Sequence, residues 1–234
     1  MTAPILELCG VVKDYRSLRP LRIERLTLDP GEQLAIIGLN EVAAQVFINL
    51  VTGAVLPDAG EIQAFGRSTG TIEEGSQWLA IVDRFGIISQ RAVLLNAFSV
   101  LQNLAVPFSL DIDPPPAEIV ERAAALADEV GIDPSVRHRR VADLDAASRA
   151  QVRLGRAVAL DPAVLLLEHP SAGLRRADVA PLERRVRAVA VARNAASLTL
   201  TGDPEFADLV ASRVLTLELA TGKLEERRRH WLRR

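Results

Sequence analysis

Two adjacent residues whose side chains can do acid–base or metal chemistry, Glu168 and His169, follow an apolar run at residues 163–167. A carboxylate and an imidazole can bind one metal ion or exchange protons. Adjacent residues on a strand, however, point to opposite faces. We therefore predict no metal site and no shared ligand here, and a structural, hydrogen-bonding role for His169.

A second candidate site begins where the apolar run 33–37 ends. The residues that follow are Gly38-Leu39-Asn40-Glu41-Val42-Ala43-Ala44-Gln45. Apolar residues at helical spacing continue to Val51, and Gly53 is placed to end that helix. A strand, a turn with glycine and a helix, in that order, mark the opening of a nucleotide-binding α/β fold.

Hydrophobic patterning predicts the elements that must position these residues. Alternating or continuous apolar runs predict strands at 5–12, 21–28, 33–38, 85–90, 163–167, 196–201 and 213–219. Helical spacing predicts helices at 42–51, 117–130 and 181–193. The stretch from Leu94 to about Arg153 is also helical in pattern, interrupted at Pro114-Pro115-Pro116. Strands and helices mixed in this way predict an α/β protein.

Composition limits the classes of protein to consider. The chain has 234 residues, enough for one α/β domain, and its net charge of −2 gives no reason to expect nucleic-acid binding. A single cysteine, Cys9, excludes an internal disulfide and fits a reducing compartment. No apolar run is long enough to span a membrane, and the N-terminus lacks the pattern of a signal peptide. We expect a cytoplasmic chain, with any membrane span carried by another subunit.

Eight segments of the chain resemble, in order and spacing, the motifs of ATP-binding cassette (ABC) transporter ATP-binding subunits. They are Tyr15, Pro30-Gly31-Glu32, Asp58-Ala59-Gly60-Glu61-Ile62, Gln90, Ser99-Val100-Leu101-Gln102-Asn103-Leu104, Leu144 with Arg156-Ala157 and Asp161-Pro162, residues 165–174, and Thr201-Gly202-Asp203. The resemblance implies a P-loop NTPase (RecA-like) core of ABC ATPase type with an antiparallel β subdomain and a helical subdomain. It also implies one nucleotide-binding domain over 1–234, with the core in 1–91 and 154–234 and the helical subdomain in 92–153.

The phosphate-binding loop departs from the family pattern. Ala44 stands at the lysine position, Gln45 at the Ser/Thr position that contacts Mg²⁺, and Glu41 and Ala43 at glycine positions. Val42 adds a β-branched side chain where positive φ would be costly. Exchanging a lysine for alanine and a glycine for glutamate makes the loop more negative by two charges. Each like-charge contact at roughly 4 Å costs about 1 kcal/mol in water and about 4 kcal/mol near a protein surface.

The other motifs of the family are altered as well. The signature reads Leu144-Asp145-Ala146-Ala147-Ser148 in place of Leu-Ser-Gly-Gly-Gln, and Asp145 is placed to cap the helix that follows. Glu168 replaces the Walker B aspartate, His169 the catalytic glutamate, Arg175 the D-loop aspartate and Gly202 the switch histidine. We predict a degenerate nucleotide site, to which Tyr15, Gly38, Asn40 and Gln90 also belong, with no catalytic residue and without the ATP and Mg²⁺ that the family binds.

Some residues allow two interpretations. Tyr15 could stack on adenine or pack on an edge turn, and Gln90 could couple the core to the helical subdomain and a membrane partner or simply end a strand. The apolar residues 94, 95, 98 and 100 could border the groove that receives a permease helix in the family, or belong to a core. The arginine-rich tail, 225–234, could lie on anionic lipid or stay solvated.

The resemblance and the departures together predict a subunit that does not hydrolyse ATP and that acts structurally or as a regulator in a membrane transport complex. Its implied partners are an integral membrane permease subunit and a second ABC subunit, either a copy of itself or a different chain. The implied location is the inner face of the cell membrane. The length and short helical subdomain resemble the lipoprotein-export and cell-division type of ABC subunit. Two alternatives stay open: a working ABC ATPase with atypical motifs, and a soluble interaction protein.

Overall fold

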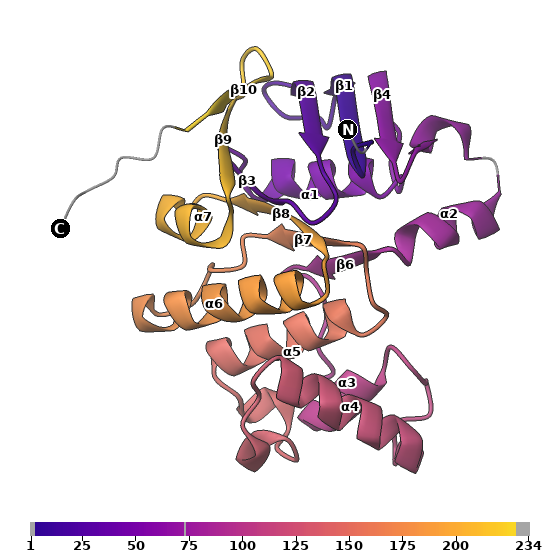
Figure 1. The fold of residues 1–234 in the computed structure, drawn as a ribbon, viewed down its shortest axis with the longest axis vertical. Helices are drawn as coiled ribbons and strands as arrows, with labels where there is room; N and C mark the ends of the chain where they lie inside the picture. The colour runs from indigo at the N-terminus through magenta and orange to yellow at the C-terminus, as the bar shows by residue number, and fades with distance from the viewer. Residues whose placement is uncertain (1–2, 73, 228–234) are drawn as a thin grey trace.

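The computed structural model describes residues 3–72 and 74–227, which form two sheets (Figure 1). The larger sheet has the strand order β10-β9-β3-β8-β7-β6 and is parallel except for β10. The smaller sheet is antiparallel, with the order β2-β1-β4-β5. The strands are β1 (Leu6–Lys13), β2 (Leu21–Leu28), β3 (Gln33–Ile37), β4 (Ala59–Ala64), β5 (Arg67–Ser68), β6 (Phe85–Ile88), β7 (Val164–Glu168), β8 (Ala196–Thr201), β9 (Arg213–Glu218) and β10 (Lys223–Glu226).

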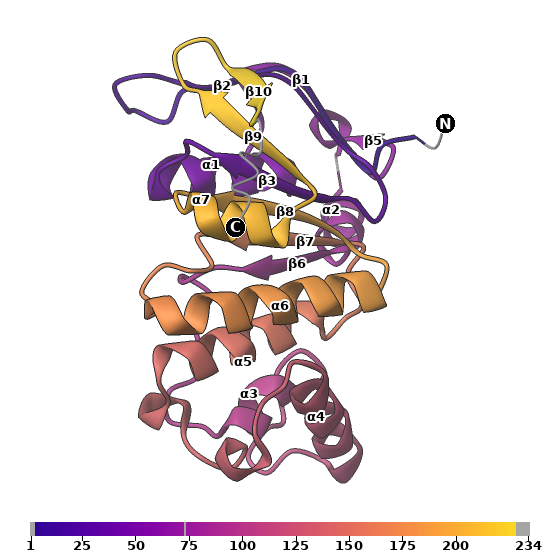
Figure 2. The same cartoon turned by 60° about the vertical axis from the view of Figure 1, so that its left-hand side comes forward.

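Helices cover both faces of the larger sheet. The α-helices are α1 (Glu41–Val51), α2 (Gly75–Val82), α3 (Val100–Ala105), α4 (Ala117–Glu129), α5 (Ala146–Val158), α6 (Arg176–Ala192) and α7 (Pro204–Val210). Figure 2 shows α1 between the two sheets, and α6 below the larger sheet with α5 beneath it. Within the described residues, no helix is both long and apolar enough to cross a bilayer.

Strand alternation divides the interior into two cores. Leu165 and Leu167 of β7 pack with α3 to α7, whereas Val164 and Leu166 pack with α1 and the smaller sheet. Because both faces of the parallel strands are covered, every residue of β7 is buried. This arrangement explains why the central strands are continuous apolar runs in the sequence.

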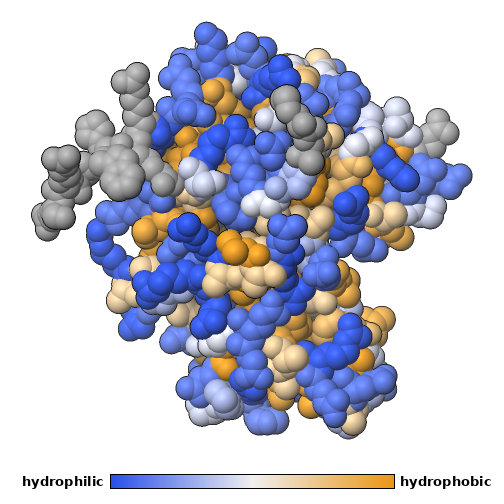
Figure 3. Space-filling view, in the orientation of Figure 1, coloured by the Kyte–Doolittle hydropathy of each residue, from blue (hydrophilic) through white to orange (hydrophobic). Residues whose placement is uncertain are grey.

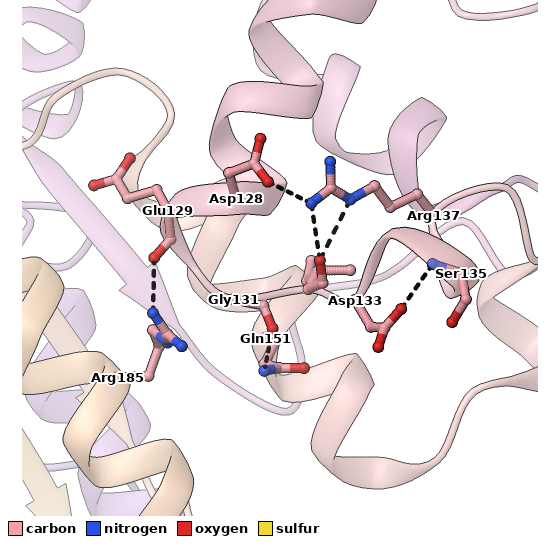
Figure 4. A network of polar contacts seen from close by, with 9 residues as sticks. Asp128, Glu129, Gly131, Asp133, Ser135, Arg137, Gln151 and Arg185 are labelled. Atoms are coloured by element: carbon pink, nitrogen blue, oxygen red, sulfur yellow. Dashed lines mark hydrogen bonds and ion pairs between the residues drawn. The ribbon is translucent and has the colours of Figure 1, made fainter.

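Polar contacts hold the end of α4 against its neighbours (Figure 4). Nη2 of Arg137 donates to Oδ1 of Asp128 at 2.6 Å, and Nε2 of Gln151, on α5, donates to the carbonyl of Gly131 at 3.1 Å. The Gln151 bond joins the end of α4 to α5, and α3 packs against both helices; we call these three helices the helical region.

Two arginines tie the helical region to α6. Arg185 donates to the carbonyl of Glu129 at 3.4 Å, as Figure 4 shows. Arg193, which follows α6, donates from Nε and Nη2 to the two carboxylate oxygens of Glu129, both at 2.6 Å, and from Nη1 to the carbonyl of Val158. A bidentate guanidinium–carboxylate pair fixes both position and orientation.

The predicted strands are present with ends shifted by one or two residues, and the antiparallel β sheet and helical region implied by the resemblance are present too. The helix predicted over 181–193 begins earlier, at Arg176, and contains Pro181 in its interior. Asp178 in its first turn pairs with Arg175 at 2.8 Å, which favours an early start because acidic groups stabilise helix N-termini. Helix α5 crosses residue 153, where we placed the end of the helical subdomain; that division stays a prediction.

Helices α2 and α7 and strands β4, β5 and β10 were not predicted from the sequence; β4 begins at Ala59, inside the stretch 58–61 that resembles a turn of the family. The signal for α7 is the pair Asp203-Pro204: the Asp203 carboxylate accepts from the N–H groups of Glu205 and Phe206, and proline suits the first helical position. Strand β10 includes residues 225 and 226, the first two of the arginine-rich tail. The tail beyond residue 227 lies outside the described residues, so its relation to lipid or solvent stays a prediction.

The surface in the orientation of Figure 1 is mixed, with hydrophilic side chains interspersed among apolar ones over both the sheets and the helical region (Figure 3). Scattered apolar side chains are normal on a protein surface. The view by itself therefore singles out no docking face, and candidate sites must come from cavities and from the partners of individual side chains.

Candidate functional site

The turn after β3 ends at Asn40, which caps the start of helix α1. Its side-chain oxygen accepts from the N–H of Ala43 at 2.8 Å, and its carbonyl accepts from the N–H of Ala44 at 2.8 Å. Asn40 is therefore the N-cap of α1, and two N–H groups of the first turn already have partners within the chain.

The helix begins at Glu41, earlier than a phosphate loop of the family pattern would require. Val42 consequently lies in the first turn of α1 with an ordinary negative φ and a largely exposed side chain, 57%. The predicted strain at Val42 is wrong, because the capped helix replaces the loop conformation that would have needed positive φ. Glycine is still required at Gly38, where φ is +111° and a Cβ would lie 2.7 Å from the carbonyl oxygen of Leu217.

Ala43 and Ala44, at a glycine and the lysine position of the resemblance, are completely buried. Their side chains belong to the core between the two sheets. Glu41 and Gln45, by contrast, are exposed and face a cavity of about 210 Å³.

This cavity brings together residues from four parts of the chain. It is lined by Glu41, Val42, Gln45, Ser89, Gln90, Arg91, Glu168, His169 and Ala172. Five of them, Glu41, Gln45, Gln90, Glu168 and His169, were predicted from the sequence to form one site. The structure places them together, and their assignment to a degenerate nucleotide site stays a prediction.

Glu168 is buried, 5% exposed, and one oxygen of its carboxylate makes two side-chain contacts. Oε2 accepts from the hydroxyl of Ser89 at 2.7 Å and forms a short ion pair with the guanidinium of Arg91. The Ser89 hydroxyl oxygen also accepts from the backbone N–H of Arg91 at 3.1 Å. The three residues form a closed network in which a guanidinium is the counterion of the buried carboxylate.

His169 and Glu168 both line the cavity, but His169 does not lie on the strand from which we predicted opposite directions for the two side chains. Strand β7 ends at Glu168, and His169 adopts a left-handed conformation with φ of 43°, so strand alternation stops there. The backbone of His169 is hydrogen-bonded to Leu200 and Ala172, but its buried Nε2 has no partner among the described residues. The predicted structural bonding is thus made by the backbone. No cluster of three metal-binding side chains occurs in the described part of the chain.

Gln90 and Tyr15 make contacts that bear on their two interpretations. Nε2 of Gln90 donates to the carbonyl of Ala172 at 3.0 Å, which joins the segment after β6 to the segment after β7. Tyr15 is half-buried and packs against the core between the sheets without lining the 210 Å³ cavity. The packing interpretation therefore accounts for Tyr15.

The signature-like segment lies away from the cavity, at the start of α5. Asp145 caps this helix as predicted: its carboxylate accepts from the N–H of Ser148 at 2.8 Å. That bond, with the side chain of Ser148 and the charges of Arg175 and Arg139, lowers the pKa of Asp145. Leu144 is buried, and Ala146 and Ala147 occupy the first turn.

The segment at the switch-histidine position is held by its neighbours. Gly202 is exposed, and a Cβ added there would meet no atom within 4 Å. The adjacent Asp203 accepts a hydrogen bond from the hydroxyl of Ser171 at 3.1 Å. Gly202 does not line the cavity, so the structure does not bring it together with Glu168 and His169.

A second cavity, about 330 Å³, lies between β6 and the helical region; we call it the groove. Leu94 lines it, whereas Val100 is fully buried in the helical core. The apolar residues that follow Gln90 therefore divide between the groove and the core.

Gly86 brings the two sides of the groove into contact. A Cβ on Gly86 would lie 2.3 Å from the carbonyl oxygen of Ala157, so only glycine lets β6 approach α5 this closely. Arg153 and Arg156 of α5 also line the groove, and burial lowers the pKa of both side chains.

Sequence reasoning missed Arg91 and Arg153, and it named Arg156 only as part of the frame around the signature motif. Arg91 directly follows Gln90, but a single arginine after a strand carries no pattern that predicts a contact with a carboxylate 77 positions away. A buried acid at the end of an apolar strand does require a counterion, so the sequence predicts that a partner exists without identifying it.

Solved structures share this architecture. The dimeric ATP-binding cassette MJ0796 bound to ADP and Pi superposes with a TM-score of 0.77 at 17% identity, covering 94% of this chain and 98% of that one. CbiO1 from Clostridium perfringens, described as part of the transporter complex CbiONQ, gives 0.80 at 20% identity, covering 96% and 88%. The fold is that of an ABC ATPase cassette.

A family model described as ABC transporter matches residues 21–172, and the chain belongs to this family. Among curated relatives, the lipoprotein-releasing system ATP-binding protein LolD of Saccharophagus degradans is 25% identical over 87% of this chain and 90% of its own length. The methionine import ATP-binding protein MetN of Brucella abortus is 27% identical over 93% of this chain but only 58% of its own length.

Proposed function

We propose that this chain is a subunit of a membrane transport complex that neither binds nor hydrolyses ATP and that serves as a structural or regulatory component. The observation that carries the proposal is the pairing of Glu168 with Arg91, because a guanidinium then lines the cavity to which the resemblance assigns a metal-bound nucleotide.

The phosphate side of the cavity supports the proposal. A nucleotide would need free N–H groups at the start of α1 and a lysine. Here the N–H groups of Ala43 and Ala44 are bonded to Asn40, and the methyl of Ala44 is buried in the core. The charged group nearest to this turn is Glu41, which would repel a polyphosphate.

The metal side does not fit a bound divalent cation either. Magnesium sites in nucleotide-binding proteins use carboxylates, hydroxyls and waters. Glu168 is already neutralised by a guanidinium, and Gln45 offers an amide where a hydroxyl is needed. Phosphoryl transfer depends on metal and lysine charges at the phosphates, so these residues support no step of hydrolysis.

The signature segment supports the same conclusion for a composite site between two subunits. In the family this segment closes on the phosphate held by the second subunit. Asp145 and the methyl groups of Ala146 and Ala147 would present a carboxylate and extra bulk there. In a homodimer Asp145 would face Glu41 of the other copy, so pairing with an unlike ABC subunit avoids that repulsion; both forms of dimer stay part of the proposal.

Membership of the ABC transporter family supports an assembly with an integral membrane permease, on the cytoplasmic face of the membrane. The relatives named as ATP-binding proteins of lipoprotein release and methionine import belong to such transport systems. In this assembly Gln90, bonded to the carbonyl of Ala172, links the core to the segment that enters the helical region.

Calorimetric titration with Mg-ATP tests the loss of nucleotide binding. We expect no saturable heat and no rise in melting temperature up to about 1 mM, whereas a ligand at 100 times its Kd would stabilise the fold by about 2.7 kcal/mol. The control pair is Glu168→Ala and Glu61→Ala, the second at an exposed strand position. A saturable shift that Glu168→Ala removes and Glu61→Ala keeps would defeat the proposal and favour an atypical ATPase.

A pull-down in detergent tests the membrane assembly. Tagged full-length chain should bring down an integral membrane protein from its own cells, in the same amount with and without added ATP. Recovery in the soluble fraction with no membrane protein would favour a soluble interaction protein instead.

A further inference from the structure

The last described residue, Arg227, lies beside helix α7. Its backbone N–H donates to the carbonyl of Val214 at 2.8 Å, and its guanidinium forms an ion pair with Oδ2 of Asp208, on α7, at 3.5 Å. The other carboxylate oxygen, Oδ1 of Asp208, is buried and has no hydrogen-bond partner among the described residues. A buried acceptor without a donor is unfavourable, so this carboxylate is left half-satisfied at the point where residues 228–234 follow.

An open furrow adjoins this point, between α6 and α7. The two helices are in contact (Figure 1), and two hollows of about 760 and 740 Å³ lie along them, both lined by Ala180 of α6 and Leu209 of α7. We call the surface lined by Val179, Ala180, Val191, Glu205 and Leu209 the α6–α7 furrow. Leu209 is 44% exposed and Val191 is 63% exposed. A segment that covered them would gain about 25 cal/mol for each Å² removed from water.

Carboxylates connect Asp208 with the furrow. Glu205 lies three residues before Asp208 and four before Leu209, so the three side chains share one side of α7. Glu205 pairs with Arg176, but these two side chains are largely exposed, at 71% and 86% respectively. An ion pair between exposed groups is worth about 0–1 kcal/mol, so a second arginine can share or replace Arg176 without a large loss.

The residues that follow Arg227 have the matching chemistry. They are Arg228-Arg229-His230-Trp231-Leu232-Arg233-Arg234, which combine four arginines with two large apolar side chains. In an extended segment residues two apart lie on the same side, so Arg229 and Trp231 would follow Arg227 along α7. Four residues of extended chain span about 13–14 Å, more than the rise of about 10 Å over the 7 residues of α7. Trp231 is therefore within reach of the furrow.

We propose that residues 228–234 bind the α6–α7 furrow of their own chain. Arg229 pairs with the two α7 carboxylates, and the indole of Trp231 covers the apolar side chains that the two hollows share. Arg184 and Arg187 line the α6 wall of one hollow and repel further cations, which favours the α7 side for the arginines of the segment. The inference concerns a contact within one chain and goes beyond the proposed function, on which it does not depend.

Tryptophan fluorescence of the whole chain tests this inference. The sequence has two tryptophans, so Trp78→Phe leaves Trp231 as the only one. We expect acrylamide to quench Trp231 at least about twofold less efficiently in the folded chain than in the same variant unfolded in urea, because a covered indole is shielded from the quencher. The protection should stay constant over an about 100-fold dilution, since an intramolecular contact has a fixed effective concentration.

Two leucine variants test the apolar part of the contact. Leu209→Arg removes the apolar surface and adds a charge that repels the arginines, so quenching of Trp231 should rise to the unfolded value. Leu160→Arg, at a leucine that is 54% exposed and outside the furrow, should leave the quenching unchanged. Circular dichroism melting of each variant, including Trp78→Phe, checks that the fold is retained.

Two double variants test the charged part. Glu205→Gln/Asp208→Asn removes both α7 carboxylates and should raise the quenching, whereas Glu61→Gln/Asp83→Asn removes two exposed carboxylates elsewhere and should not. Because Asp208 is partly buried, Glu205→Gln alone serves as the milder change, and it should give part of the rise.

A photo-crosslink gives a readout that leaves Trp78 in place. Benzoylphenylalanine in place of Trp231 should form an intramolecular adduct that mass spectrometry maps to α6 or α7. An adduct elsewhere in the chain, or no adduct, would overturn the inference.

Three results of the quenching experiment would also overturn it. Equal quenching in the folded and unfolded chain would show that Trp231 is not covered. Protection that disappears on dilution would assign the contact to a second copy of the chain. Protection that appears only with phosphatidylglycerol vesicles would assign the segment to lipid. None of these results bears on the Mg-ATP titration, so the inference and the proposed function fail separately.

Discussion

The helical region and its border with the rest of the molecule contain two sets of arginines that differ in their partners. The paired arginines, Arg137 and Arg193, each bond to a carboxylate at 2.6 Å. The groove arginines, Arg153 and Arg156, have no carboxylate among the described residues. Because both sets are at least half-buried, this difference predicts that the paired arginines contribute more to the stability of the fold than the groove arginines do.

The largest effect is expected from Arg193→Met, which removes both bonds to Glu129 and the bond to the Val158 carbonyl. Leaving a partly buried carboxylate without its counterion should lower the free energy of unfolding by about 2–3 kcal/mol. Urea denaturation measures this loss of stability. If Arg193→Met lost less stability than Arg153→Met, the contrast between the paired arginines and the groove arginines would be wrong.

The next effect is expected from Arg91→Met. Glu168 would keep only Ser89 as a partner for a carboxylate that is 5% exposed, which should cost about 1–2 kcal/mol, because Arg91 itself is partly solvated. The double variant Arg91→Met/Glu168→Met should recover part of that loss, since neither charge is then left alone. Additive losses in denaturant titrations would show that the pair is not coupled.

A smaller, pH-dependent effect is expected at Glu183 on α6, which is buried and has no hydrogen bond or ion pair in the described structure. Burial raises the pKa of Glu183 above its usual 4.5, partly offset by the charges of Arg187 and Arg184. The native state therefore holds this proton more tightly than the unfolded chain, and stability falls as pH rises from 4.5 through the raised pKa.

Glu183→Gln should remove that fall. We expect its melting temperature to exceed that of the native chain by about 2 °C at pH 8, with the gain vanishing at pH 4. Differential scanning calorimetry at the two pH values measures the difference. An equal gain at both pH values would point to packing, and not ionisation, as the cause.

The smallest effect is expected from Arg153→Met in the isolated chain. Because the guanidinium has no partner to lose, the free energy of unfolding should change by less than about 0.5 kcal/mol, or rise. A destabilisation as large as that of Arg193→Met would show that Arg153 is a folding residue.

The sequence predicts the strands and helix ends of this molecule better than its polar contacts. Runs such as 33–37 and 163–167 are buried on both faces, so their apolar character identifies them directly, and Asp145 and Gly53 mark helix ends through local bonds. Arg91 and Arg193 pair with carboxylates that lie 77 and 64 positions away in the sequence. Only the folded topology brings such pairs together.

Two mistaken expectations have one physical origin. Apolar spacing predicted a helix from residue 42, yet we expected backbone strain at Val42 from the family's loop pattern. We also expected strand alternation across Glu168 and His169. In both places the backbone changes conformation at one residue, at Asn40 through a side-chain cap and at His169 through a left-handed turn. Neither event is visible in hydrophobic periodicity, which reports on stretches and not on single residues.

The cap at Asn40 also limits which substitutions could give this turn the phosphate loop of the family pattern. With the turn already wound into helix, Ala44→Lys alone would drive an ammonium group into the apolar space between the sheets, where the alanine is now fully enclosed. A designer, or a lineage under selection, would have to rebuild the backbone from residue 40 to residue 43 before that lysine had anywhere to point. A phosphate loop at this position would therefore require a new backbone conformation as well as a lysine.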